Sequence, residues 1–427
     1  MNLPTQATQD GNGTPLATFT YDNANRRTGV TYANNVTQTV GYDSTGRQTS
    51  IGAKKADGTV LTSFTYTYLT ATGGTESVRA SVTDKDGNLT TYGYDALNRL
   101  TNAVTKSSGG ATTATYAYSY DGANNRTSAT TPTGSTTYSY NTANELTSRV
   151  TNGSTTTSTY DANGNLTGET NGLTLAYNVL NQTGSVTPAG QGAQQYTYSG
   201  PNEAQRVAVN GTAVRYSKLG LYQRNPTDVF FRDNSGLLLA AGLGAGEYYY
   251  LFDALGSVMG LTDISGNLVQ SYQYDPYGNV TNSTGSIDNP YQYASGYTDS
   301  ATGLIQFGLR YYQPATGRWT QQDPLAGSLF DPSSGNRFVY ANANPVNLVD
   351  PTGADIWCPL SIIAATAVSI SSAAGVFSTA GAIFSVAAPL LAASGAFVVG
   401  AVLLTGFFAA ALVLPIVLAI HYSCGWI

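Results

Sequence analysis

The sequence is poor in charged residues and in the side chains that most often do chemistry. Asp, Glu, Lys and Arg make up 10% of its 427 residues, and the formal net charge is −6. Nucleic-acid binding needs clustered Lys and Arg, so this composition predicts no nucleic-acid partner. The only histidine is His421, and the only cysteines are Cys358 and Cys424. These numbers exclude a disulfide framework and a structural zinc site, and they disfavour a histidine-based catalytic triad.

Several sequence signals are also missing. The stretch from Met1 to Asp10 has neither a basic region nor an apolar run, so no cleavable signal peptide is visible. There is no P-loop, no Rossmann glycine pattern and no carboxylate cluster spaced for calcium, so we predict neither a cofactor nor a metal ion. No Asp, Glu, Lys or Arg follows Asp355. This change in composition marks the clearest domain boundary.

Tyrosine and glycine are abundant and are arranged in a repeat. The chain has 31 tyrosines and 47 glycines, a composition typical of short strands joined by tight turns. A tyrosine precedes a turn at intervals of roughly 17 to 26 residues. It occurs at Tyr21, Tyr42, Tyr68, Tyr94, Tyr120, Tyr140, Tyr160, Tyr177, Tyr198 and Tyr216. Looser turns are predicted at Asp233 and Asp253, and a further clear one at Tyr274.

Each repeat is predicted to form a β-hairpin. In Tyr116–Tyr120 the tyrosines alternate, which places them on one face of a strand. An Asp-x-x-Asn or Asp-x-x-Gly turn follows, as at Asp95 and Asp161, because Asp bonds the backbone two residues on and Asn or Gly tolerates positive φ. One hairpin is marginal alone, so successive hairpins should pair into one sheet. We therefore predict a mainly β fold, a spiralling antiparallel β-hairpin repeat sheet, followed by an α-helical hydrophobic hairpin.

The Tyr-Asp-x-x-Gly/Asn-Arg pattern resembles the YD repeat of Rhs proteins, teneurins and the C components of bacterial Tc toxins. The resemblance covers about residues 20 to 353 and implies a sheet that spirals into a hollow shell around a C-terminal cargo. Family shells are generally longer, which leaves three outcomes: an open sheet, a partial cage, or a cage completed by a partner chain. The alternative to the family is an unrelated Tyr/Thr-rich β solenoid or adhesin.

A denser motif lies between Tyr274 and Gly353. It includes the segments 303–312, 317–324 and 336–345, and it resembles the Rhs-associated core. We therefore predict three parts: a YD-repeat region at residues 1–270, the core at 271–353, and a hydrophobic C-terminal segment at 354–427.

The core resemblance also implies a site. Some family members cut their own chain just after the final Asp-Pro-x-Gly, with two aspartates acting as in an aspartyl protease. By motif, these catalytic residues are Asp323 and Asp350, with Arg318 to orient or charge-balance them and the cut near Ala354. Two adjacent carboxyls cannot both ionise easily, so one serves as an acid and the other as a base.

The sequence departs from the family pattern at Gln322, where a basic residue is frequent, and at Ala354, where leucine is common. The simpler interpretation is that each Asp-Pro makes a turn. Asp331 is the fallback carboxylate. Enzymatic activity is therefore left open and is at most a single-turnover self-cleavage.

The C-terminal segment is apolar almost throughout. Two stretches, 362–388 and 396–420, are long enough to span a membrane, and Pro389 lies between them. The alternative is a buried pair of soluble helices. Cys358 and Cys424 flank the pair and form either a disulfide or two free thiols.

These features predict a membrane-associated, secreted or cell-surface protein of the Rhs kind. The first hypothesis is a polymorphic-toxin-like carrier with a membrane-inserting segment and an accompanying immunity protein. The second is a membrane-tethered YD-repeat surface or adhesion protein without catalysis. The third is a truncated Rhs fragment.

Overall fold

The computed structural model of the protein describes residues 3–8, 15–69, 78–199, 205–325 and 335–354. All of these residues lie in one compact unit. Asp331, both cysteines and the two predicted spans at 362–388 and 396–420 fall outside the described residues. In the part of the chain that is described, no helix has the length and apolar character that crossing a bilayer requires.

The repeat turn forms as the sequence predicts. The Oδ1 atom of Asp95 accepts hydrogen bonds from the backbone nitrogens of Leu97 and Arg99, each 3.0 Å long. The backbone nitrogen of Asn98 donates to the Asp95 carbonyl at 2.9 Å, and Asn98 adopts a φ of 57°. Asparagine and glycine tolerate this left-handed conformation better than other residues. The Asp-x-x-Asn spacing is therefore a direct consequence of the turn geometry.

The same pair of bonds to one side-chain oxygen recurs along the chain. It begins at Asp22, Asp43, Asp84, Asp121, Asn141, Asp161, Asn178, Asp233, Asp253, Asp263 and Asp275. The predicted looser turns at Asp233 and Asp253 are thus confirmed as full members of the series.

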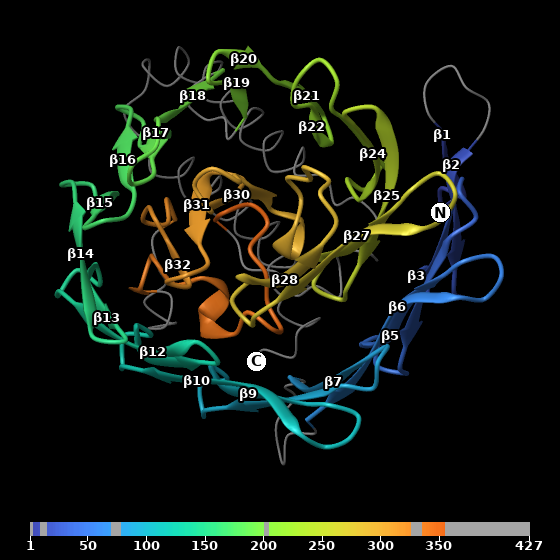
Figure 1. Ribbon diagram of the computed structural model, residues 1–427, viewed down its shortest axis with the longest axis horizontal. Helices are drawn as coiled ribbons and strands as arrows, with labels where there is room; N and C mark the ends of the chain where they lie inside the picture. The colour runs from blue at the N-terminus through green and yellow to red at the C-terminus, as the bar shows by residue number, and fades with distance from the viewer. Residues whose placement is uncertain (1–2, 9–14, 70–77, 200–204, 326–334, 355–427) are drawn as a thin grey trace, which may run out of the picture. The chain divides into compact units, whose positions relative to one another are not determined.

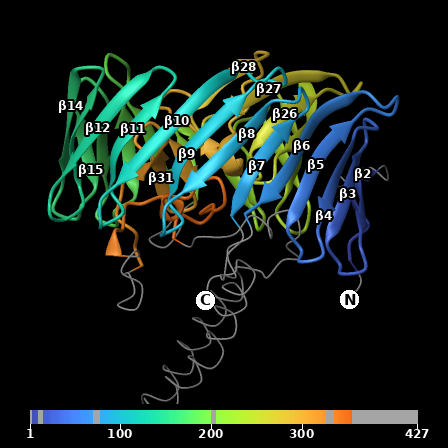
Figure 2. The ribbon, with the colours of Figure 1, turned by 90° about the horizontal axis from the view of Figure 1, so that it is seen from below.

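These turns connect the strands of three antiparallel sheets, in which each strand pairs with the next along the chain. The first sheet contains β1 (Gln6–Thr8), β2 (Pro15–Tyr21), β3 (Arg27–Tyr32), β4 (Thr37–Tyr42), β5 (Gln48–Lys54), β6 (Val60–Tyr68), β7 (Arg79–Asp84), β8 (Leu89–Tyr94), β9 (Leu100–Lys106), β10 (Thr112–Tyr120), β11 (Arg126–Thr131), β12 (Gly134–Tyr140), β13 (Leu146–Thr151), β14 (Ser154–Tyr160), β15 (Leu166–Glu169), β16 (Thr174–Tyr177), β17 (Thr183–Thr187), β18 (Gln194–Tyr198), β19 (Arg206–Val209) and β20 (Thr212–Ala213). Figure 2 shows its strands side by side in chain order.

The second sheet contains β21 (Arg215–Ser217), β22 (Gly220–Gln223), β23 (Val229–Arg232), β24 (Leu238–Leu243), β25 (Gly246–Phe252), β26 (Val258–Thr262), β27 (Leu268–Tyr274) and β28 (Val280–Thr284). The third contains β29 (Tyr297–Thr298), β30 (Ile305–Phe307), β31 (Arg310–Gln313) and β32 (Arg318–Trp319). Helical structure in the described residues consists of short 3-10 turns, among them η1 (Tyr293–Ser295) and η3 (Ala341–Ala343). The predicted mainly β, antiparallel fold is confirmed for this part of the chain.

The repeat tyrosines tie each hairpin to the one before it. The hydroxyl of Tyr42 donates to the backbone carbonyl of Arg27 at 2.9 Å, and the hydroxyl of Tyr94 donates to that of Arg79 at 2.7 Å. Equivalent bonds are made by Tyr68, Tyr120, Tyr140, Tyr177, Tyr198 and Tyr274. We call this series the tyrosine ladder. These hydroxyl bonds explain why tyrosine rather than phenylalanine occupies these positions before a turn.

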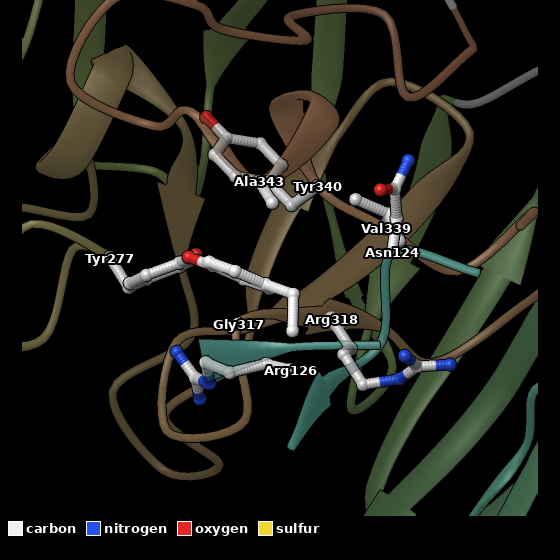
Figure 3. Close-up of a pocket in the computed structure, with 9 residues that line it drawn as sticks. Asn124, Arg126, Tyr277, Gly317, Arg318, Val339, Tyr340 and Ala343 are labelled. Atoms are coloured by element: carbon white, nitrogen blue, oxygen red, sulfur yellow. The ribbon is translucent and has the colours of Figure 1, made fainter. Parts of the chain in front are cut away.

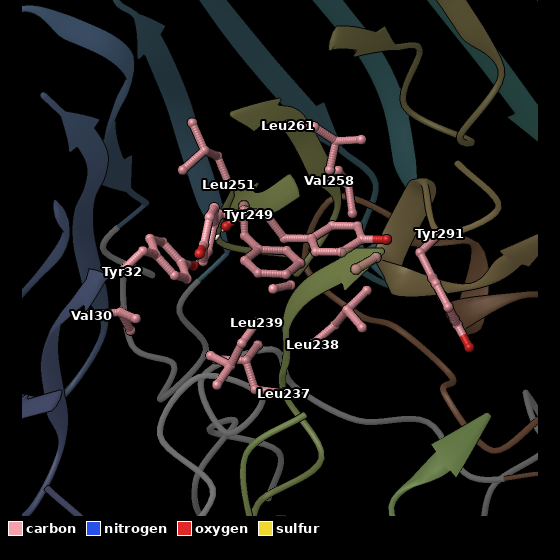
Figure 4. Packing of buried hydrophobic residues seen from close by; sticks show 14 of the residues in the cluster. Val30, Tyr32, Leu237, Leu238, Leu239, Tyr249, Leu251, Val258, Leu261 and Tyr291 are labelled. Atoms are coloured by element: carbon pink, nitrogen blue, oxygen red, sulfur yellow. Dashed lines mark hydrogen bonds between the residues drawn. The ribbon is translucent and has the colours of Figure 1, made fainter. Parts of the chain in front are cut away.

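A hydrophobic core joins the first and second sheets. Val30 and Tyr32 of β3 pack in one cluster with Leu237–Leu239 and with Tyr249 and Leu251 of β25, and Figure 4 shows these side chains together. A buried ion pair links the same two sheets, with Arg27 Nη2 2.6 Å from Asp233 Oδ2.

The core segment, which we define as the described residues 289–325 and 335–354, packs against the inner face of the first sheet. Its Asn336 donates to Asn125 Oδ1 at 2.6 Å, and its Gln321 donates to the Asn181 carbonyl at 2.9 Å. Figure 1 shows β30, β31 and β32 inside the curve of the repeat strands. The repeat turns therefore provide a frame that fixes the core segment.

Candidate functional site

One arginine contacts both aspartates that the sequence singles out. The Nη2 atom of Arg310 lies 2.7 Å from Asp323 Oδ2 and 2.9 Å from Asp350 Oδ2. The two carboxylates are separated by 27 positions in the chain (350 minus 323), yet they share a single nitrogen. The structure thus brings Asp323 and Asp350 into one site, with Arg310 between them.

Arg310 begins β31 and is almost completely buried. Its guanidinium lies over the Trp319 ring, with Cζ 4.1 Å from the ring centroid. Burial lowers the pKa of Arg310, and the charges of Asp323 and Asp350 act against that shift. The two ion pairs help to offset the cost of taking this guanidinium out of water.

Arg310 also reaches the peptide chain at the predicted cut. Its Nε atom donates to the carbonyl oxygen of Gly353. Asp350 Oδ1 accepts a 3.1 Å hydrogen bond from the backbone nitrogen of Ala354. The two sides of the Gly353–Ala354 peptide bond are therefore held by a cation and by a carboxyl group.

Asp350 makes the same local turn as the repeat aspartates. As at Asp95, the backbone nitrogen four residues on bonds to Oδ1, and the residue three positions on, Gly353, has a positive φ of 68°. In the repeats, an arginine that is local in sequence, such as Arg99, bonds the second carboxylate oxygen. At Asp350 that place is taken by Arg310 from a different strand.

Two glycines allow this turn to lie directly on the β30–β31 hairpin. A Cβ atom on Gly308 would lie 2.0 Å from the Thr352 carbonyl oxygen, and one on Gly353 would lie 2.3 Å from the Phe307 carbonyl oxygen. Real side chains essentially never approach a backbone atom so closely, so any larger residue would force the two segments apart. The lack of side chains at Gly308 and Gly353 thus allows the turn to pack closely beside Arg310, and we call these two residues the glycine clamp.

The two aspartates differ in access to solvent. The side chain of Asp323 is 21% exposed, whereas that of Asp350 is 2% exposed. Asp323 Oδ1 accepts a 2.8 Å bond from the backbone nitrogen of Leu325. Asp323 is therefore the more solvent-accessible of the two carboxylates.

Arg318 lies apart from these aspartates, at a small pocket that it lines with Val339 and Tyr340 (Figure 3). Its guanidinium donates to Asn125 Oδ1 at 3.0 Å and to the Asn144 carbonyl, both in turns of the first sheet. It stacks over the rings of Tyr140 and Phe338. The sequence does contain a signal for Arg310, since it is the only charged residue between Asp299 and Arg318.

The arrangement is suited to polarising one peptide bond. A guanidinium on a carbonyl oxygen stabilises the negative charge that develops there during hydrolysis. Two carboxyls near one another can divide acid and base roles. Within the described residues, no group of three or more His, Cys, Asp or Glu side chains is placed to hold a metal ion.

Family comparisons agree with the repeat and the core. The Teneurin YD-shell family matches residues 221–346, and the RHS Repeat family matches residues 79–112. The structure resembles that of a Tc holotoxin pore from Photorhabdus luminescens, with a TM-score of 0.65 and 20% identity over 85% of this chain and 20% of that chain. The chain carries Rhs/YD repeats. The predicted resemblance to this family is confirmed, and the likeness to the Tc structure shows that the YD-repeat fold is shared.

Curated relatives of this YD-repeat chain include toxins. It is 33% identical over 198 residues to the tRNA3(Ser)-specific nuclease WapA of Bacillus spizizenii, covering 43% of this chain and 8% of the relative. It is 38% identical over 113 residues to the toxin subunit YenC1 of Yersinia entomophaga, covering 25% of this chain and 11% of the relative. The chain thus spans a small part of the length of the relatives that it matches.

Proposed function

We propose that this chain is the carrier part of a polymorphic-toxin-like Rhs protein, that its core cuts the chain near Ala354, and that the C-terminal segment enters a membrane. The observation that supports the cut most directly is the Arg310 guanidinium, which contacts both aspartates and the Gly353 carbonyl. Toxin subunits and a nuclease among the relatives support the carrier role. A secreted or cell-surface location fits both the carrier role and the membrane-entering segment.

The cleavage step uses one water molecule. For the Gly353–Ala354 bond, Asp323 takes a proton as the water oxygen attacks the Gly353 carbonyl carbon, and Arg310 stabilises the oxygen that becomes negative. Asp350, in its protonated form, gives its proton to the Ala354 nitrogen as the carbon–nitrogen bond breaks. The products are a carboxylate on Gly353 and a new amino terminus.

The test is the intact mass of the full chain, made in a cell-free system so that precursor and products are both recovered. We expect wild type to yield two fragments with a new amino terminus at Ala354 or Asp355, and Asp323→Asn and Asp350→Asn to remain whole. The control is Asp57→Asn, in an exposed repeat turn, which should cut like wild type. An uncut wild type would refute the cleavage.

The membrane role needs its own test, because the spans lie outside the described residues. Residues 356–427 contain no Asp, Glu, Lys or Arg, which favours partition into a bilayer. We expect the full chain to float with neutral phosphatidylcholine vesicles in a density gradient. A chain that stays at the bottom of the gradient would contradict membrane entry.

Partners are proposed on two grounds. TcdB2 and TccC3 occur together in solved structures that resemble this fold, with a TM-score of 0.64 for one of them, which favours a shell completed by a partner chain. A membrane-active segment would also require an immunity protein in the producing cell. Co-purification from that cell, followed by mass spectrometry, should recover one or both.

A second candidate function is a tethered surface protein without catalysis. The observation in its favour is that Asp350 makes the same turn as Asp95, a residue with no catalytic setting. In that case all the aspartate variants and wild type would give one uncut band of equal mass.

A further inference from the structure

Within the described ranges, Arg337 is a charged side chain next to the site that makes no ion pair. It lies on the segment after β32, and its side chain is half-buried. Its Nε atom donates to the backbone carbonyl oxygen of Asp323 at 2.7 Å, and its Nη2 atom donates to the same oxygen. Among the described residues, every hydrogen bond of this guanidinium goes to that one atom, and no carboxylate pairs with it.

The backbone of Arg337 completes the connection. Its carbonyl oxygen accepts a 2.9 Å bond from the Asp323 nitrogen and a 3.2 Å bond from Arg310 Nη1. Arg337 therefore hydrogen-bonds to both the backbone nitrogen and the backbone carbonyl of Asp323, and it also hydrogen-bonds to Arg310, the ion-pair partner of Asp323.

These hydrogen bonds matter because Asp323 is less buried than Asp350. Asp350 is fixed by its own turn and by the glycine clamp, whereas the Asp323 side chain reaches solvent. A catalytic carboxylate that drifts by about 1 Å can lose on the order of a hundredfold in rate. Arginine suits the task, because its planar fork places two donors on one oxygen without competing for the carboxylate.

We infer that Arg337 is a positioning residue that holds Asp323 in line with Arg310 and the peptide bond at Ala354. The inference rests on the proposed self-cleavage and goes beyond it by assigning a role to a side chain that touches neither reacting atom.

The test compares first-order cleavage rates in a cell-free pulse–chase for wild type, Arg337→Met and Arg337→Lys. Methionine keeps much of the length and removes both donors, and we expect the rate to fall by about ten- to a hundredfold. Lysine restores one donor and should recover a substantial part of the rate. Arg26→Met, which removes an equally half-buried arginine from a repeat turn, should leave the rate unchanged.

Thermal unfolding separates positioning from general stability. We expect the Arg337→Met and Arg337→Lys variants of the uncut Asp350→Asn chain to melt together, so that only the cleavage rates differ. Equal rates for wild type and Arg337→Met would overturn the inference while leaving the cleavage intact, and so would a lysine variant that is as slow as methionine. An uncut wild type would instead refute the proposed function, and the role of Arg337 with it.

Discussion

Asp350 Oδ1 lies 3.1 Å from the backbone nitrogen of Ala354, the same bond that Asp95 makes to the nitrogen of Arg99. One local sequence pattern thus serves two settings. At Asp22, Asp43 and Asp95 of the repeats, the carboxylate is partly exposed and pairs with an arginine four residues on. In the core, it is buried and pairs with Arg310 from another strand. The candidate site therefore contains a turn like that at Asp95, but with its carboxylate buried in the core segment.

The first prediction concerns which arginine serves the site. We expect Arg310→Lys to reduce cleavage by at least about tenfold, because one ammonium group cannot contact Asp323, Asp350 and the Gly353 carbonyl together. Arg318→Lys should leave cleavage close to wild type, since its partners are in the turns of the first sheet. The measurement is the cut fraction by intact mass after a fixed time.

Both substitutions are at buried positions, so folding must be followed as well. Circular dichroism with a β-sheet minimum and a cooperative melt for each variant would show that the fold is kept. Loss of cleavage in Arg318→Lys, with Arg310→Lys still active, would reverse the assignment in favour of Arg318.

The second prediction concerns the glycine clamp. Gly308→Ala should slow cleavage by about tenfold or more, because the new Cβ would lie 2.0 Å from the Thr352 carbonyl and would displace the turn that contains Asp350. Gly110→Ala is the matched control, since Gly110 also has a positive φ of 87° but has nothing within 4 Å of its Cβ position. It should cost about 1 kcal/mol of stability and leave the rate alone. Equal cleavage rates for the two variants would argue against the clamp.

The third prediction is a loss of stability in acid. Burial tends to raise the pKa of Asp43, but hydrogen bonds from Thr45 and Arg47 outweigh this effect and hold that pKa at about 2. That value lies below the unfolded value of about 3.9, so the stabilisation is fully present above about pH 4 and is lost as the pH falls toward 2. Urea midpoints measured from pH 5 to 2 should fall across this window.

Asp43→Asn supplies the comparison, because its amide does not titrate. We expect the variant to be less stable than wild type at pH 5 and the two curves to converge near pH 2. Curves that stay parallel over the whole range would rule out a contribution from Asp43.

The fourth prediction concerns the ion pair between the first and second sheets. Arg27→Met should lower the free energy of unfolding by about 3–5 kcal/mol, because it leaves the Asp233 carboxylate buried without a cation. Adding Asp233→Asn should recover much of this loss, since the amide oxygen still accepts from Ser235 and Leu237. Urea unfolding of the two variants and wild type gives the values. If Arg27→Met alone were as stable as wild type, the Arg27–Asp233 ion pair would contribute little to stability.

Much of the repeat architecture could be predicted from sequence because its determinants are local. The turn at Asp95 needs only residues 95 to 99, and an alternating strand needs only its own side chains. The turns at Asp84 and Asp263 were not singled out, since threonine rather than tyrosine precedes each of them. Their Asp-x-x-Gly spacing also predicts a turn, so this spacing identifies more of the turns than the preceding tyrosine does.

The site was harder to predict, because it depends on residues far apart in the chain. The motif named Asp323 and Asp350, and the structure places both on Arg310. The motif also named Arg318, whereas the structure places the guanidinium of Arg310, from β31, on both carboxylates. Whether cleavage occurs stays a prediction, as do the domain boundaries and the membrane spans.

The tyrosine ladder has a consequence for how such chains change length. Every rung joins one hairpin to its immediate predecessor, so a complete hairpin can be inserted or removed and the neighbours still find equivalent partners. Removing a single strand reverses the direction of every later strand, and removing one residue within a strand turns the following side chains of that strand to the opposite face. The repeat region can therefore change length without breaking the ladder only by whole hairpins.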